Sequence, residues 1–150
     1  MQEYYMREAL IEAQKAMDLK EVPIGAVIVY DDKIIARAHN LRETAKDPTA
    51  HAEILAIRQA SQVLGGWRLP NCDLYVTIEP CPMCAGAVML ARIRKLIIGA
   101  MDKKGGAAGS LLNIPGDDRF NHNTEIITGV LEEECASIMK EFFKELRNKS

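Results

Sequence analysis

Two short motifs carry side chains of the types that bind a metal ion. Pro80-Cys81-Pro82-Met83-Cys84 places two thiols three positions apart, and His51-Ala52-Glu53 places a carboxylate two positions after an imidazole. Zinc favours thiolate and imidazole ligands, and a set of one His and two Cys leaves one tetrahedral position open for water. A bound zinc acidifies that water at neutral pH. We therefore expect one catalytic Zn²⁺ per chain, held by His51, Cys81 and Cys84.

The carboxylate of Glu53 has two interpretations. A glutamate in the first turn of a helix has the reach to approach a water on the metal, where it would act as a proton shuttle. Alternatively, Glu53 is an ordinary acid that the positive end of the helix dipole stabilises. Glu53 taken alone favours the second interpretation, and Glu53 beside three metal ligands favours the first.

The cysteine pair also has alternative uses. A Cys-x-x-Cys pair can be a redox dithiol or half of a structural zinc site, and a fourth protein ligand would close the site. Four side chains could supply this fourth ligand, but none lies at a metal-motif spacing from the others: Cys72, Cys135, His39 and His122. Cys135 falls on an apolar helix face and Cys72 begins a strand, so both are predicted to be core or semi-buried thiols.

The first half of the chain predicts the elements that position His51. Apolar residues at helical spacing indicate an opening helix that ends before Pro23. A β-branched apolar run, Gly25–Tyr30, and a second strand, Lys33–His39, flank a two-residue turn and are predicted to form a hairpin. A loop over 40–48 leads into a helix over about 50–64. The residues expected on the buried side of that helix are Ile54, Leu55, Ile57 and Ala60.

The second half predicts the elements around the cysteines. A strand over 74–78 is broken by Pro80 and leads into a helix that ends near Arg92, and Lys95–Ala100 is a strand expected to be parallel to the first. Residues 102–124 are irregular, with a possible helical turn over 110–113. A short strand at 126–127 precedes the last helix. Its apolar face comprises Leu131, Cys135, Ile138, Phe142 and Leu146. The fold class is therefore α/β.

Composition limits the class of protein. A chain of 150 residues that is 48% hydrophobic is expected to form one domain over 1–150. It shows no apolar run of membrane-spanning length and no secretory signal, so we expect a soluble, cytoplasmic protein with reduced thiols and no membrane partner. A formal charge of −2 does not suggest a general nucleic-acid binder, yet basic residues gather at 92–104 and 140–149.

The combination of the two motifs resembles the cytidine-deaminase-like zinc enzymes, in which water replaces an amino group of a nucleobase. More narrowly, the chain resembles the bacterial tRNA adenosine deaminases over nearly its whole length. The segments that carry this narrower resemblance are Glu21-Val22-Pro23-Ile24-Gly25-Ala26-Val27, Ala38-His39-Asn40, Leu74-Tyr75-Val76-Thr77-Ile78-Glu79-Pro80, Gly106-Ala107-Ala108-Gly109-Ser110 and Phe120-Asn121-His122.

That resemblance implies a three-layer α/β/α fold with a five-stranded mixed sheet, a homodimer, and conversion of adenosine to inosine at the wobble position of a tRNA anticodon stem-loop. It implies that Asn40 contacts the target nucleotide, that Ile24 and the Ala52 backbone line the base pocket, and that Asn121 and His122 hold flanking nucleotides. With an RNA substrate, basic side chains acquire a role as phosphate contacts. Those predicted for this role are Lys103, Lys104, Lys144 and Arg147.

Three competing functions stay open at the level of sequence. A free-base or nucleoside deaminase would use the same zinc chemistry on a small molecule, but the segments 106–110 and 120–122 favour the RNA enzymes. A nonenzymatic zinc module would need a fourth ligand and no essential carboxylate. A thiol-disulfide oxidoreductase would need a thioredoxin-like chain around its cysteines, which this sequence lacks.

Overall fold

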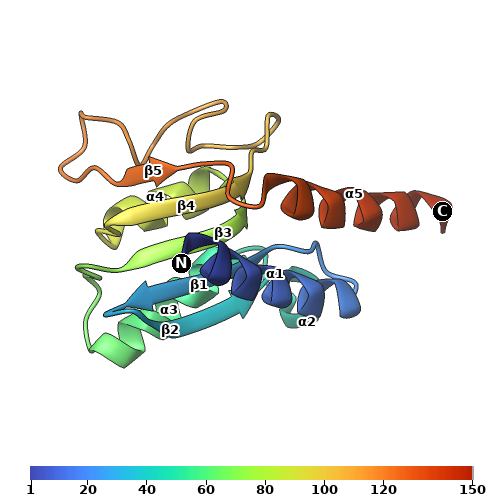
Figure 1. Ribbon diagram of the computed structural model, residues 1–150, viewed down its shortest axis with the longest axis horizontal. Helices are drawn as coiled ribbons and strands as arrows, with labels where there is room; N and C mark the ends of the chain where they lie inside the picture. Colours follow the sequence, from blue (N-terminus) through green and yellow to red (C-terminus); the bar gives the residue numbers. More distant parts are fainter. Residues whose placement is uncertain (150) are drawn as a thin grey trace.

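One mixed sheet of five strands organises the protein in a computed structural model that describes residues 1–149 (Figure 1). The strands lie in the order β2-β1-β3-β4-β5. They are β1 (Gly25–Tyr30), β2 (Lys33–His39), β3 (Asp73–Ile78), β4 (Lys95–Ala100) and β5 (Glu125–Ile127). The helices are α1 (Gln2–Asp18), α2 (Arg42–Ala45), α3 (Ala52–Leu64), α4 (Pro82–Leu90) and α5 (Glu132–Asn148).

The directions of the strands determine which segments meet. β1 is antiparallel to both β2 and β3, as the predicted hairpin requires, and β3, β4 and β5 are parallel to one another. β2 therefore runs the same way as β3 and β4, so all three strands end at one edge of the sheet. We call this the carboxyl edge. The segments that follow these strands begin at residues 40, 79 and 101, and they meet there.

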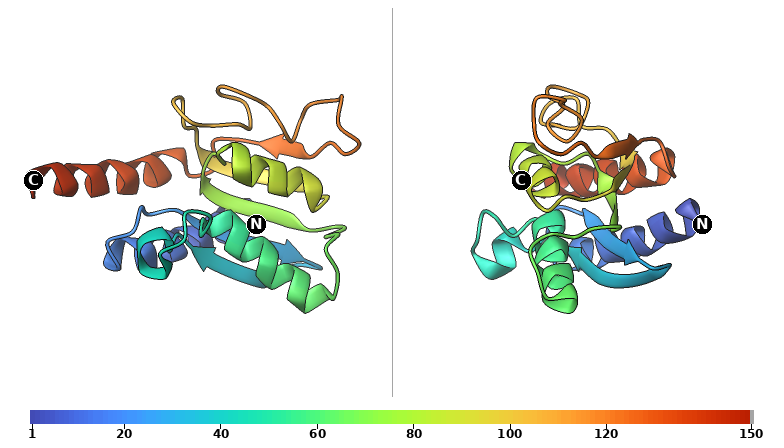
Figure 2. Two further views of the ribbon diagram at one scale, coloured as in Figure 1. Left: turned by 180° about the vertical axis from the view of Figure 1, so that it is seen from behind. Right: turned by 90° about the vertical axis from the view of Figure 1, so that its left-hand side faces the viewer.

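Helices cover both faces of the sheet, which confirms the predicted three-layer α/β/α fold (Figure 2). Side chains alternate between the faces because successive residues of a strand point to opposite sides. Ile28 and Val76 pack in the core beneath α3 and α4, whereas Val27 and Ile97 pack in the core beneath α1 and α5. The predicted strand over 95–100 and its parallel pairing with β3 are also confirmed.

Two features of the first half differ from the sequence prediction. The segment predicted as a loop over 40–48 contains α2, a single helical turn. In α3, the residues that face the sheet are Ala52, Glu53, Ala56 and Ala60, whereas Ile54, Leu55 and Ile57 are only partly buried. Alanines let the helix lie close to the strands, so the larger side chains occupy its flanks.

The segment over 102–124 contains no helical turn at 110–113, contrary to the prediction. Ala108 instead pairs with Asn113 in an isolated antiparallel bridge, and the N–H of Gly109 donates to the carbonyl of Leu112 at 2.8 Å. The segment leaves β4 at the carboxyl edge and returns to the start of β5 at the opposite edge (Figure 1).

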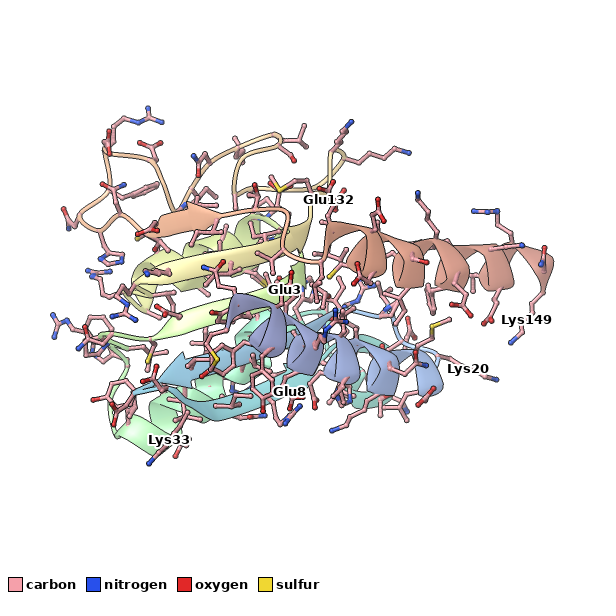
Figure 3. The ribbon with its side chains drawn as sticks, in the orientation of Figure 1. Glu3, Glu8, Lys20, Lys33, Glu132 and Lys149 are labelled. Atoms are coloured by element: carbon pink, nitrogen blue, oxygen red, sulfur yellow. The ribbon has the colours of Figure 1, made fainter. Side chains whose placement is uncertain are left out.

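Helix α5 lies against the sheet only through its first turns. Cys135 is its one buried residue among those described, and the helix then extends past the carboxyl edge (Figure 1). Figure 3 labels Glu132 and Lys149 at its two ends, with Lys149 on the same side of the molecule as Lys20 at the end of α1. The predicted apolar face is therefore half-covered: Phe142 is partly buried, and Leu146 is exposed. No helix within residues 1–149 combines the length and apolarity needed to cross a membrane.

Candidate functional site

A cluster of three metal-binding side chains lies between the N-termini of α3 and α4. His51 directly precedes α3, and Cys81 directly precedes α4 with Cys84 in its first turn. The Nδ1 atom of His51 is 3.7 Å from Sγ of Cys81 and 3.5 Å from Sγ of Cys84. The potential ligand atoms of all three lie within 4.8 Å of one another. One His and two Cys at these distances can hold a metal ion.

Hydrogen bonds at the start of α4 favour a thiolate at Cys81. A hydrogen bond from Cys84 outweighs the effect of burial, and with help from the backbone N–H groups of Cys84 and Met83 it lowers the pKa of Cys81 to about 5. The same pairing and burial raise the pKa of Cys84. A helix N-terminus contributes in the same sense because its free N–H groups stabilise an anion. The cluster therefore supplies an anionic sulfur for a cation.

Glu53 is buried beside this cluster. Its side chain is 3% exposed, and its Oε1 is the only buried side-chain polar atom in residues 1–149 without a hydrogen-bond partner. Burial is the main reason that the pKa of Glu53 rises to about 7, and the nearby Cys81 raises it further. A buried oxygen without a partner is costly, so its presence here indicates that this atom faces a ligand or a reacting group.

The four side chains considered as a fourth ligand lie elsewhere. His39 pairs with Glu12 at 2.9 Å, and Nε2 of His122 is 2.8 Å from the carbonyl oxygen of Ile93. Cys72 and Cys135 are buried in separate hydrophobic clusters. In the described chain, residues 1–149, His51, Cys81 and Cys84 form the one such group of metal-binding side chains. A three-ligand set leaves a coordination position free for water.

Three of the residues predicted to contact the substrate meet at the carboxyl edge. The backbone N–H of Asn40 donates to the carbonyl of Ile24 at 3.2 Å, and the Asn40 Oδ1 accepts from the N–H of Ala52 at 2.8 Å. Asn40 is 2% exposed and Ala52 is fully buried. The side chain of Asn40, which directly follows β2, thus caps the first turn of α3 at Ala52, the residue between His51 and Glu53.

The other predicted contacts are spread over the molecule. Asn121 is exposed, and the hydrogen bond of His122 to Ile93 places it just before β4, at the edge opposite the metal cluster. Lys103 and Lys104 are exposed on the segment that follows β4. Lys144 and Arg147 lie on the projecting half of α5. The structure therefore does not bring Asn121, His122, Lys144 or Arg147 together with His51 and the cysteines, whereas Lys103 and Lys104 lie on a segment at the same carboxyl edge as the cluster.

Two buried glutamates near the site were not recognised from the sequence. Glu21 accepts hydrogen bonds from the N–H of Glu43 and from the N–H and hydroxyl of Thr44, and so holds α2. Glu79 holds the segment that follows β4. Burial opposes ionisation of both, but the hydrogen bonds outweigh it and hold each pKa below its ordinary value. Their partners lie more than twenty residues away, so no local pattern indicates them.

Comparison with known folds defines the class of protein. A sequence profile of the MafB19-like deaminase family matches residues 1–147. A solved structure from a study of A-to-I editing by tRNA:A34 deaminases superposes with a TM-score of 0.87 at 48% identity, covering 90% of this chain and 98% of that one. A structure of NE0047 with 2,6-diaminopurine gives 0.82 at 26% identity, covering 95% and 81%. Fold and site together define a deaminase of the cytidine-deaminase-like class.

Curated relatives define the family within that class. The tRNA-specific adenosine deaminase of Bacillus subtilis (strain 168) is 57% identical over 147 residues, which cover 98% of this chain and 91% of that protein. The chloroplastic tRNA(adenine(34)) deaminase of Arabidopsis thaliana is 49% identical over 158 residues, covering 95% of this chain but 12% of that much longer protein. The chain belongs to the tRNA-specific adenosine deaminase family.

Proposed function

We propose that this protein hydrolyses adenosine to inosine at the wobble position of a tRNA anticodon loop, using one zinc ion held by His51, Cys81 and Cys84. The observation that carries the proposal is the unpartnered, buried Oε1 of Glu53 beside a three-ligand cluster. The similarity to tRNA-specific adenosine deaminases over nearly the full chain supports the choice of substrate.

The donor set fits zinc better than the other common metals. Thiolate and imidazole ligands in a compact set of three are typical of zinc, whereas magnesium and calcium prefer oxygen ligands. When bound, zinc lowers the pKa of a coordinated water and so supplies a nucleophile at neutral pH. His51 and the two cysteines hold their positions because two helix N-termini fix the backbone on both sides of the cluster.

Glu53 moves the protons of the reaction. Its Oε1 accepts a proton from the attacking water, delivers it to a ring nitrogen of adenine, and later assists departure of the amino group as ammonia. A pKa near 7 suits this role, because a shuttle must both accept and donate at the operating pH. The buried setting also keeps bulk water away from the carboxylate.

Asn40, Ile24 and Ala52 form the pocket that holds the target base. The Oδ1 of Asn40 already accepts from Ala52, so its Nδ2 is the group that donates to the target nucleotide. Ile24 supplies an apolar surface at the same edge of the sheet. A flipped base between an apolar side chain and a buried amide is held by stacking and by one directional hydrogen bond.

Replacing Asn40 by alanine tests its connection to α3. The N–H of Ala52 would lose its acceptor while staying buried, so Asn40→Ala is expected to lower the free energy of unfolding by about 1–3 kcal/mol. Urea unfolding followed by circular dichroism measures this loss. Asn123→Ala is the matched control, because Asn123 is exposed. Equal stability of the two variants would show that the capping bond contributes nothing.

Six further residues contact the RNA outside the base pocket. Asn121 and His122 hold flanking nucleotides, and Lys103, Lys104, Lys144 and Arg147 contact phosphates, which position an RNA without reading its sequence. An anticodon loop already presents unpaired bases, so flipping one costs less than opening a duplex. We further propose that residues 1–150 form one catalytic domain and that the protein is a cytoplasmic homodimer.

The direct test is incubation of the purified zinc protein with a tRNA that carries an unmodified wobble adenosine. Nuclease digestion and mass spectrometry are expected to find inosine at that position. Free adenosine, guanine and cytosine serve as controls for a small-molecule deaminase. Turnover of a free base or nucleoside without inosine in the tRNA would overturn the proposed substrate.

A further inference from the structure

Glu79 lies between the sheet and the metal-binding turn, but the proposed chemistry assigns it no role. It follows the last residue of β3 and precedes Pro80 and Cys81. Its side chain is only 4% exposed. An ionised carboxylate in such a place needs several hydrogen-bond donors to offset the loss of hydration.

Those donors all come from one segment, residues 102–113, which we call the 102–113 loop. Oε1 of Glu79 accepts from the N–H of Asp102 at 2.9 Å and from the Ser110 hydroxyl. Oε2 accepts from the N–H of Ala108 at 3.0 Å and from the N–H of Ser110 at 2.9 Å. One carboxylate thus holds both ends of the segment 102–110.

Gly106 lies so close to the carboxylate of Glu79 that no side chain fits at this position. A Cβ atom added to Gly106 would lie 2.1 Å from Cδ of Glu79 and 2.2 Å from its Oε1. The N–H of Ala107 also donates to the carbonyl of Pro80 at 2.8 Å, next to the metal ligand Cys81. The 102–113 loop is therefore fixed directly against the residues that carry the cluster.

Asp102 links the carboxylate of Glu79 to the turn that carries Lys103 and Lys104. Asp102, whose N–H binds Glu79, accepts from the N–H groups of Lys104 and Gly105 at 3.1 and 3.2 Å. The turn that carries Lys103 and Lys104 is therefore built on Asp102. Both side chains are exposed, and within residues 1–149 neither lysine has an ion-pair partner.

We propose that Glu79 is a positioning residue for substrate binding: it fixes the 102–113 loop so that Lys103 and Lys104 meet the phosphates of the RNA beside the metal site. The inference rests on the proposed RNA substrate. Its physical basis is preorganisation, because a lysine on a fixed turn loses less conformational entropy on binding a phosphate than one on a mobile turn. Glu79 therefore acts on RNA affinity and not on the chemical step.

Glu79→Gln is the first test. The amide replaces one acceptor oxygen by an NH₂ group that faces N–H donors, so at least one side of the loop is released. Binding of an anticodon stem-loop, measured by fluorescence anisotropy, is expected to weaken roughly tenfold, with KM rising in parallel and kcat kept within about twofold. Zinc content is expected to stay at that of wild type.

A double-mutant cycle separates positioning from general stability. In a Lys103→Ala/Lys104→Ala background, Glu79→Gln is expected to cause no further loss of affinity, because the groups it positions are gone. Relative to wild type, the slope of log affinity against log salt is expected to become shallower by up to about 1.4 in Glu79→Gln, in Lys103→Ala/Lys104→Ala and in the combined variant alike, since each phosphate contact on a single strand contributes about 0.7. Additive losses would overturn the proposal, as would a loss of zinc in Glu79→Gln.

A glycine variant approaches the same contact from the loop. Gly106→Ala displaces the Glu79 carboxylate and is expected to weaken RNA binding like Glu79→Gln. Gly66→Ala is the control, because Gly66 is exposed outside the 102–113 loop and an added Cβ there meets nothing within 4 Å. Ser110→Ala removes a single donor and tests the contact if Glu79→Gln does not fold, again with weaker binding expected. Unchanged affinity in Gly106→Ala or Ser110→Ala would contradict the proposal.

The outcomes distinguish this inference from the proposed function. If the wild-type protein neither binds nor deaminates the stem-loop, the RNA substrate itself is wrong. If the wild type binds and deaminates while Glu79→Gln binds equally well, the positioning role alone is wrong.

Discussion

Replacement of Glu53 by glutamine is expected to remove deamination while leaving the metal site loaded. The amide has nearly the same shape but cannot accept a proton from water, so kcat is expected to fall by roughly 10²–10⁴-fold, the usual contribution of a general acid–base group. Zinc should stay near one ion per chain, because Glu53 is not among the three ligands. Inosine formation in tRNA and elemental analysis of the same sample measure both quantities.

Glu12→Gln is the control for the removal of a buried charge. Glu12 is 2% exposed, as buried as Glu53, but its carboxylate pairs with Lys15, Arg37 and His39 near α1. Its loss is expected to lower the stability of the protein and to leave the turnover of folded enzyme close to wild type. Full activity in Glu53→Gln would exclude the proton shuttle, and equal inactivation of both variants would attribute the loss to folding.

Cys84→Ala is expected to abolish both zinc binding and deamination. Cys84 is fully buried in the first turn of α4, and its loss leaves only two of the three ligands, His51 and Cys81. Two ligands hold zinc far more weakly than three, so the purified variant is expected to contain less than about a tenth of an ion per chain. Elemental analysis after dialysis against a chelator at fixed concentration makes the comparison quantitative.

Cys72→Ala is the matched control because Cys72 is also a fully buried thiol, but it packs among apolar residues just before β3. Its replacement leaves a small cavity and is expected to keep the full zinc content and activity. Zinc retained in Cys84→Ala would show that the ligand set is different, and zinc lost from Cys72→Ala would implicate the core rather than the cluster.

The sequence predicted the elements that carry the chemistry because their signals are local. The β-branched runs of β1 and β2, the proline after Cys81 and the spacing of the two motifs lie within short windows. The prediction that His51 and Cys81 begin helices is confirmed. In the folded chain β2 and β3 run in the same direction on either side of β1, so the segments that follow them bring His51 and Cys81 to one edge of the sheet.

The packing of α3 and the loops around the site could not be predicted in the same way. The prediction for α3 relied on the largest apolar side chains, yet contact with the sheet selects Ala52, Ala56 and Ala60 at spacing of four. α2 is one turn long, so it has no periodicity to detect, and the contacts of Glu21 and Glu79 depend on residues that only the folded chain brings close.

The separation between the helices that carry the metal ligands and the segments that face the substrate has a consequence for protein engineering. The cluster depends on α3 and α4, whereas Glu21 holds the segment 41–49 and Glu79 holds the segment 102–110. We therefore expect that these two segments can be exchanged for others of different length while the reactive centre stays intact, provided that Asn40 is kept. A transplanted segment must bring its own N–H donors for the two carboxylates, so these two residues mark where new substrate specificities can be grafted.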